Sequence, residues 1–314
     1  MDPLAPWKLT QDYLNSLPES FGLSTLTPLS PLAEPLRALK GNRMTHVMAI
    51  LNVTPDSFSD GGVHAKTPIS DTISAFLNDG ATMVDIGGQS SRPYAPDVSA
   101  DEEISRILPA LENIKLLTNL KPVISVDTYR AEVAEAAVKA GADMINDISS
   151  GQLDPAMLRT MARLGKTVCL SHTRGDSRTM QSLINYDPKG LIPTIAEEIL
   201  QRVKEAEEAG VRRWRIILDP GIGFAKTKDH NLEVLRRLDE LHDWPGLRGL
   251  PWLVGTSRKS FVGKITGVQE PRERTWGTAA TVAAAVRGGA DIVRVHDVHE
   301  MAQVAKMSDA IWRI

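Results

Sequence analysis

The sequence predicts an α/β fold, a (β/α)8 TIM barrel preceded by an irregular N-terminal extension. About eight short apolar runs alternate with segments of helical period along the 314 residues. Several helical segments end in glycine with the next apolar run close behind, as in Asp79-Gly80-Ala81, which is typical of a helix that returns the chain to a sheet. Eight such units with right-handed crossovers close into a barrel of about 250 residues. A doubly wound open sheet is the alternative fold.

The first 43 residues differ from the rest in composition and in hydrophobic pattern. Prolines occur at positions 3, 6, 18, 28, 31 and 35, and no apolar period is sustained. We therefore interpret residues 1–43 as a Pro-rich extension or linker, with a short helix around residues 9–17. Residues 44–314 are predicted to form the barrel domain.

The predicted elements alternate throughout this domain. Strands are expected where apolar runs are short and end on polar residues, at 46–53, 81–87, 122–127, 143–148, 167–172, 215–219, 252–255 and 291–296. Helices are expected where apolar residues recur with a period near 3.6, at 69–78, 102–117, 131–140, 156–164, 192–209, 232–241, 275–287 and 301–312.

Nearly every predicted strand finishes on a polar group that an apolar barrel does not need. These groups are Asn52, Asp85, Asp127, Asn146 with Asp147, His172, Asp219, Ser257 to Lys259, and Arg294 with His296. A capping or supporting hydrogen bond would explain any one of them. Because the carboxyl ends of parallel strands meet at one end of a barrel, we expect all of them to converge on one mouth.

Composition excludes several classes of function. The formal charge of −3 provides no basic field for nucleic acid, and no apolar run approaches the length of about 20 residues needed to cross a membrane. The single cysteine, Cys169, argues against a disulfide framework and a thiolate metal cluster. We expect a soluble, intracellular protein with no nucleic-acid or membrane partner.

The segment from Asn52 to Gly62, NVTPDSFSDGG, strongly resembles dihydropteroate synthase, and later segments agree in the order of that family. These segments are Asp85 to Pro93, Ser125 to Thr128, Ile145 to Ile148, His172 to Gly175, Asp219 to Phe224, Gly255 to Ser260 and Arg294 to His296. The resemblance runs from about residue 44 to the end. It implies a barrel that joins (7,8-dihydropterin-6-yl)methyl diphosphate to 4-aminobenzoate, releasing diphosphate and 7,8-dihydropteroate for folate synthesis, with Mg²⁺.

A diphosphate leaving group needs cations or hydrogen-bond donors, and usually a hard cation with oxygen ligands. Arg92, Arg294 and His296 can supply the donors, and the resemblance implies that Asn52 is the Mg²⁺ ligand. Simpler explanations exist for three of these residues. Arg92 could be an ordinary surface residue, His296 a supporting imidazole, and Asn52 a strand-end cap.

The flat edge of a pterin presents adjacent N–H donors, which a buried carboxylate can accept. Asp219 is placed for that role because Pro220 and Gly221 end its strand. By resemblance, Asp127, Asn146 and Lys259 are further pterin contacts. Asp127, Lys259 and Arg294 are also our predicted catalytic residues.

The other aromatic substrate, 4-aminobenzoate, is expected to lie against Phe224, with Pro93 and Ser257, although Phe224 could equally be a core residue. Ser91 is a further predicted substrate contact, and it stands where the family commonly has Thr.

The family resemblance implies ionisation at the exocyclic carbon of the pterin. Diphosphate departs, and nearby anions such as Asp127 stabilise the cation that remains. An aniline nitrogen is largely neutral at pH 7, so no nucleophilic residue is assigned, and Cys169 and Ser257 should form no covalent intermediate. The loops at residues 54–67 and 88–98 are expected to close over the substrates.

Two other functions compete with this prediction. One is a methyl-folate:corrinoid methyltransferase, which would share the pterin pocket but need no diphosphate clamp. The other is a catalytically silent module of a larger folate protein, since the Pro-rich start resembles the linker of fungal multifunctional proteins. The resemblance also implies a homodimer, a pterin pyrophosphokinase as an upstream domain or partner, a location in the cytoplasm or mitochondrion, and a sulfonamide target, although the departures from the family pattern leave the sensitivity to sulfonamides open.

Overall fold

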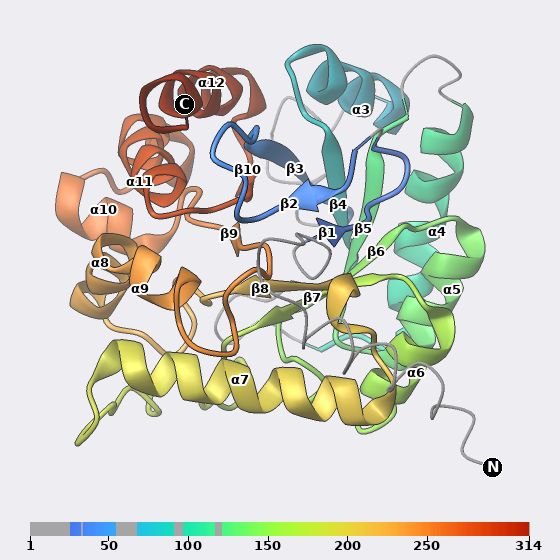
Figure 1. The fold of residues 1–314 in the computed structure, drawn as a ribbon. Coiled ribbons are helices and arrows are strands. Elements are labelled where there is room, and N and C mark those ends of the chain that lie inside the picture. The colour runs from blue at the N-terminus through green and yellow to red at the C-terminus, as the bar shows by residue number, and fades with distance from the viewer. Residues whose placement is uncertain (1–25, 33, 55–67, 91–96, 117–120, 314) are drawn as a thin grey trace.

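Eight parallel strands form the centre of the molecule in a computed structural model that describes residues 26–32, 34–54, 68–90, 97–116 and 121–313 (Figure 1). Neighbouring strands follow the order β8-β7-β6-β5-β4-β3-β10-β9. Their bounds are β3 His46–Asn52, β4 Met83–Gly87, β5 Val123–Asp127, β6 Met144–Asp147, β7 Thr167–Ser171, β8 Ile216–Asp219, β9 Leu253–Val254 and β10 Ile292–Val295.

The two outer strands of this order, β8 and β9, also meet. Leu218 forms a parallel bridge with Trp252, and the Leu218 amide donates to the carbonyl of Pro251 at 2.8 Å. This bridge closes the sheet on itself. The predicted (β/α)8 barrel is confirmed, and the open doubly wound sheet is wrong.

Helices surround the strands on the outside of the barrel (Figure 1). They are α3 Ile69–Asn78, α4 Ala100–Leu116, α5 Ala131–Ala140, α6 Met157–Leu164, α7 Leu191–Ala209, α8 Lys228–Arg236, α9 Leu238–His242, α10 Ser260–Thr266, α11 Thr275–Arg287 and α12 Val298–Trp312. Short 3-10 turns occur at Arg213–Arg215 and Pro271–Glu273. The C-caps of α5, α6 and α7 are Gly141, Gly165 and Gly210, each in the left-handed conformation. Gly141 and Gly210 were predicted as helix ends, and Gly165 was not.

One apolar residue from each strand fills the lower part of the barrel. The eight are Met48, Met83, Val123, Met144, Cys169, Ile217, Leu253 and Ile292, and they form a single buried cluster. The barrel is therefore a packed core at this level, and an open site can lie only above it.

Part of the predicted extension packs against this cluster. Leu29 and Leu36 belong to the cluster, and the hydroxyl of Thr167 donates to the carbonyl of Pro28 at 2.8 Å. The segment forms a small antiparallel pair, β1 Leu26–Thr27 with β2 Leu36–Arg37, which the sequence did not predict. The helix predicted at residues 9–17 lies outside the described residues.

Two helical details differ from the prediction. The single helix expected at residues 232–241 is divided at Arg237 into α8 and α9, and α10 was not predicted. Among the residues that the structure describes, no helix combines the length and the apolar character that crossing a membrane requires.

Candidate active site

A layer of polar side chains lies directly above the apolar floor. Because side chains alternate along a strand, the residue two positions after each floor residue points into the barrel one layer higher. These residues are Ile50, Asp85, Ser125, Asn146, Ser171, Asp219, Gly255 and Arg294. Most of them are polar, so the barrel changes from apolar to polar within one layer.

Arg294 on β10 holds two carboxylates of this region together. Its Nε donates to Asp85 Oδ2 at 2.6 Å, and one of its terminal nitrogens donates to Asp127 Oδ2 at 2.8 Å. Burial alone would lower the pKa of the guanidinium, but the charges of Asp85 and Asp127 raise it above its ordinary value. Arg294 is therefore a fixed cation at the centre of the mouth.

Asn146 on β6 joins the same network. Its Nδ2 donates to Asp85 Oδ2 at 3.0 Å, so one carboxylate oxygen accepts from both Asn146 and Arg294. Asp85 is completely buried, whereas the side chain of Asp127 is 13% exposed. The structure thus brings the predicted residues Asn146, Asp127 and Arg294 together through Asp85.

Asp127 has an unusual pKa. Desolvation by burial raises the pKa of its carboxyl to about 7, although the charge of Arg294 opposes this shift. A carboxyl with a pKa near neutrality in a mouth lined by cations is typical of a functional group.

Asp219 on β8 is held by the turn that follows it. The amide of Gly221 donates to Asp219 Oδ1 at 2.7 Å. Gly221 has φ +68°, and a Cβ at this position would lie 1.8 Å from the carbonyl oxygen of His172, so only glycine fits the turn. Burial raises the pKa of Asp219, and the charge of Lys259 opposes this shift.

Lys259 lies across the same turn. Its ammonium donates to the carbonyl of Ile222, and burial lowers the pKa of the ammonium to about 8 against the attraction of Asp219. The space that Gly223 leaves by lacking a side chain is occupied by the stem of Lys259, whose Cδ lies 3.0 Å from the position of the missing Cβ. The Lys259 nitrogen is 4.9 Å from the centre of the Phe224 ring, a cation–π contact.

Ser257 and His296 meet at the end of β9 and β10. The hydroxyl oxygen of Ser257 accepts from the amide of His296 at 3.1 Å and lies 3.0 Å from His296 Nδ1. Arg258, which the sequence did not single out, stabilises this corner. It has φ +59° and forms an ion pair with Asp297, so the turn that carries Ser257 and Lys259 is tied to the residue after His296.

Asn52 and Asp127 border the same gap above Gly87. A Cβ at Gly87 would lie 3.5 Å from Asn52 Oδ1 and 3.8 Å from Asp127 Oδ2, so both oxygens face the space that the glycine leaves open. An amide oxygen and a carboxylate oxygen are the donor types that Mg²⁺ prefers, and Mg²⁺ commonly takes its other ligands from phosphate and water. Within the described residues no group of three or more His, Cys, Asp or Glu side chains could hold a metal alone. The residues present therefore fit Mg²⁺ only together with a phosphate ligand.

Some of the predicted site lies outside the described residues. This holds for Ser91, Arg92 and Pro93, and for most of the loop predicted at 54–67. The ends of the other loop are pinned, since the amide of Val98 donates to the Gln89 side chain at 2.9 Å. Both expectations about these loops stay predictions.

A family model described as pterin binding enzyme matches residues 48–296, which include β3 from Met48 onward and the other seven strands of the barrel in full. The chain belongs to this pterin-binding family. Its motif-bearing strands supply Asp85, Asn146, Asp219 and Arg294, so the matched region and the polar layer are the same part of the molecule.

Named relatives agree with this family. The chain is 48% identical over 272 residues to a dihydropteroate synthase of Synechocystis, covering 86% of this chain and 91% of that protein. It is 51% identical over 271 residues to a folic acid synthesis protein of Pneumocystis carinii, covering 86% of this chain but only 36% of that protein. The chain thus spans nearly the whole bacterial enzyme but about a third of the fungal protein.

Solved structures of the family share the fold. A Yersinia pestis dihydropteroate synthase in complex with a sulfonamide drug superposes with a TM-score of 0.80 and 38% identity, over 91% of this chain and 98% of that one. A Xanthomonas albilineans dihydropteroate synthase with 4-aminobenzoic acid superposes with a TM-score of 0.78 and 34% identity, over 92% and 99%.

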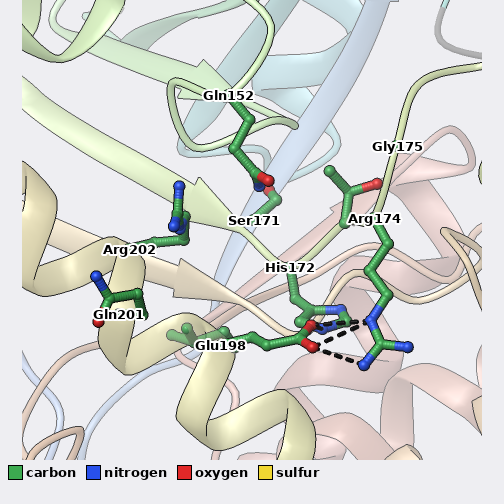
Figure 2. A pocket seen from close by; sticks show the side chains of 10 residues that line it. Gln152, Ser171, His172, Arg174, Gly175, Glu198, Gln201 and Arg202 are labelled. Atoms are coloured by element: carbon green, nitrogen blue, oxygen red, sulfur yellow. Dashed lines mark hydrogen bonds and ion pairs between the residues drawn. The ribbon is translucent and has the colours of Figure 1, made fainter.

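A second polar cluster lies outside the barrel wall, where His172 is turned toward α7 (Figure 2). Lys226 donates to His172 Nδ1 at 2.7 Å, and His172 Nε2 lies 2.8 Å from Glu198, which also pairs with Arg174. Burial lowers the pKa of Lys226 to about 7 and that of His172 to about 4. The expectation that His172 joins the other polar groups at the mouth is wrong, because adjacent strand residues face opposite sides.

The cluster borders a cavity of about 280 Å³ between β7 and α7, lined among others by Gln152, Arg174 and Arg202. Asp147 also turns away from the mouth, since its carboxylate accepts from the amides of Ser149 and Gly151 at 2.7 and 2.6 Å. The side chains of His172 and Asp147 therefore stabilise the loops that follow their strands and do not line the mouth.

Proposed function

We propose that this protein is a dihydropteroate synthase, a transferase that condenses (7,8-dihydropterin-6-yl)methyl diphosphate with 4-aminobenzoate. The observation that carries the proposal is the linked set of Asp85, Asn146, Asp127 and Arg294 above the apolar floor, with Asp219 and Lys259 opposite. It combines acceptors for a heterocycle edge with a fixed cation for an anion, and the relatives that share this barrel are named dihydropteroate synthases.

The heterocycle would bind with its N–H edge toward Asp219 and Asn146. One Asp219 oxygen is taken by the Gly221 amide, so the other is available to a ligand. Lys259 would donate to the carbonyl side of the ring. These contacts fix the exocyclic carbon beside Asp127 and Arg294.

The reaction would break the bond between the exocyclic carbon and the diphosphate oxygen, with the electron pair leaving on diphosphate. Arg294 and His296, with Arg92, would bind the leaving anion. Asp127, whose pKa is about 7, would be drawn to its ionised form by the cation that develops next to it. The aniline nitrogen then attacks the carbon and releases one proton. Because the aniline itself is the nucleophile, no protein nucleophile is needed.

The same proposal assigns Mg²⁺ as the cofactor. Asn52 would supply a protein ligand and the diphosphate oxygens would supply others, as the gap above Gly87 permits. When bound, the ion neutralises charge on the leaving group. Ser257, Phe224 and Ser91 would contact the aminobenzoate, and the sulfonamide complex of the Yersinia pestis relative supports the same pocket as a drug site.

The chemistry of the substrates, the surface of the barrel and the relatives point to the partners and the location. A diphosphate substrate has to be made by a pyrophosphoryl transfer, which a pterin pyrophosphokinase would perform as an upstream domain or separate protein. Exposed apolar side chains on α11 and α12, among them Trp276 at 84% and Met307 at 63% exposure, support a homodimer. An Arabidopsis thaliana relative at 42% identity is named as mitochondrial, so mitochondrion and cytoplasm both stay proposed locations.

A direct assay tests the proposal. The protein is incubated with the pterin diphosphate, 4-aminobenzoate and Mg²⁺, and dihydropteroate and diphosphate are quantified by chromatography and mass spectrometry. Equimolar formation of both products is expected, and it should be lost in Arg294→Met. A folded protein that forms no product would instead favour a catalytically silent module.

A further inference from the structure

Asp85 lies beneath the proposed site without reaching it. Its carboxylate is completely buried on β4, and Oδ2 accepts from Arg294 Nε at 2.6 Å and from Asn146 Nδ2 at 3.0 Å. Among the described residues its other oxygen, Oδ1, has no hydrogen-bond partner although it is buried. So Asp85 touches two residues of the site but is sealed off from solvent.

The contact with Asp85 determines how the amide of Asn146 is oriented. A carboxylate oxygen accepts hydrogen bonds and cannot donate them, so the part of the amide that faces it has to be the NH₂ group. Asn146 Oδ1 is therefore directed elsewhere, and no protein donor bonds to it in the part of the chain that the structure describes. The backbone of Asn146 is already used, since its carbonyl accepts from Thr128 at 3.1 Å.

We propose that Asp85 is a positioning residue that sets the hydrogen-bonding polarity of the heterocycle pocket. By holding the NH₂ group of Asn146, it presents Asn146 Oδ1 as an acceptor, alongside the free oxygen of Asp219. The pocket then selects a ring edge rich in N–H donors and rejects a ring that places an acceptor there. This inference rests on the proposed function, because it takes a pterin as the ligand.

Asp85→Leu and Asp85→Asn together test whether Asp85 acts as the acceptor that orients Asn146. Leu has a shape similar to Asp but offers no acceptor, so the amide of Asn146 is free to rotate and present its donor where the ligand needs an acceptor. In Asp85→Asn the carbonyl oxygen of the new amide can take the place of Oδ2 and still accept from both Arg294 Nε and Asn146 Nδ2, while its NH₂ group takes the place of the unpartnered Oδ1. A mismatched buried hydrogen bond weakens binding by about tenfold to a hundredfold.

The measurement separates the heterocycle from the anion. Isothermal titration with 6-hydroxymethyl-7,8-dihydropterin should show a Kd about tenfold to a hundredfold higher in Asp85→Leu, and Asp85→Asn should bind at least about fivefold more tightly than Asp85→Leu. Titration with inorganic diphosphate and Mg²⁺ should show a much smaller loss in Asp85→Leu, since Arg294 keeps its contact with Asp127. A general loosening of the fold would weaken both ligands.

A change at the other partner tests the same contact. Asn146→Asp should bind the dihydropterin poorly, because it brings two carboxylates as close as the present 3.0 Å contact.

Asp143→Asn is the matched control. Asp143 precedes β6 at the opposite end of the barrel, where it accepts from the amide of Ile124 at 3.1 Å, and its replacement should leave dihydropterin affinity unchanged. The inference is overturned if Asp85→Leu binds the dihydropterin as the wild type does, or if Asp85→Asn binds no better than Asp85→Leu. A wild type that binds no dihydropterin would overturn the proposed function itself.

Discussion

Replacing Asp127 with Asn should make the protein more stable and much less active. The pKa of Asp127 is raised from 3.8 to about 7 by desolvation, so ionisation of this group favours the unfolded chain. Each pKa unit is worth about 1.4 kcal/mol, which gives roughly 4 kcal/mol for the full shift. Solvent at the open mouth screens part of this, and we expect a gain of about 1–3 kcal/mol at pH 8.

The sign of the pH dependence follows from the direction of the shift. The folded protein holds the Asp127 proton more tightly than the unfolded chain, so the contribution of this proton to stability is present below pH 3.8 and is lost as the pH rises through about 7. Asn does not titrate. The advantage of Asp127→Asn should therefore grow between about pH 4 and 7 and stay constant above that range.

Urea unfolding without ligands, followed by tryptophan fluorescence at pH 5 and pH 8, measures this difference. Asp101→Asn, an exposed change in the first turn of α4, is the control and should behave alike at both pH values. Turnover of Asp127→Asn should fall by about a hundredfold or more, because the developing cation loses its anion. If Asp127→Asn changed the free energy of unfolding equally at pH 5 and pH 8, the raised pKa of Asp127 would be refuted.

Three further predictions follow from the same site. Asn52→Ala should raise the Mg²⁺ concentration for half-maximal activity by about tenfold, measured by metal titration, and unchanged Mg²⁺ dependence would exclude Asn52 as a ligand. The affinity for the pterin diphosphate should fall above about pH 8, as Lys259 loses its proton, and Lys259→Arg should remove this fall in a pH series of binding constants. Cys169→Ala should keep turnover, because burial raises the pKa of the Cys169 thiol and keeps it from acting as a nucleophile. The variant should lose about 1–2 kcal/mol of unfolding free energy, because Cys169 is a buried floor residue. A folded Cys169→Ala protein without turnover would contradict the absence of a covalent step.

The barrel was predictable because its strands are buried on both faces and short, so each appears as an isolated apolar run between helical segments. The division at Arg237 was not predictable in the same way. Val234, Leu235, Leu238 and Leu241 keep a helical period across it and are all buried, and no glycine or proline marks the break. Tertiary packing of both pieces decides this boundary.

Much of the candidate site was predictable from polar residues at strand ends, but the side of the sheet to which each side chain points was not. Ser171 and His172 are neighbours, yet one follows the floor residue Cys169 by two positions and the other does not. His172 therefore faces α7 and bonds to Glu198. Choosing between the two sides requires the register of the strand, which a run of apolar residues does not reveal.

Counting in steps of two from the floor would have recovered the inner layer, including Asp85, to which the sequence analysis assigned no role in the site. From Met83 the count gives Asp85 and then Gly87, which are the network carboxylate and the glycine that opens the gap beside Asn52. From Ile292 it gives Arg294 and His296. The apolar floor excludes water from below, which raises the pKa of Asp127 and makes its pairing with Arg294 strong. The same alternation that packs the core therefore sets the electrostatics of the mouth.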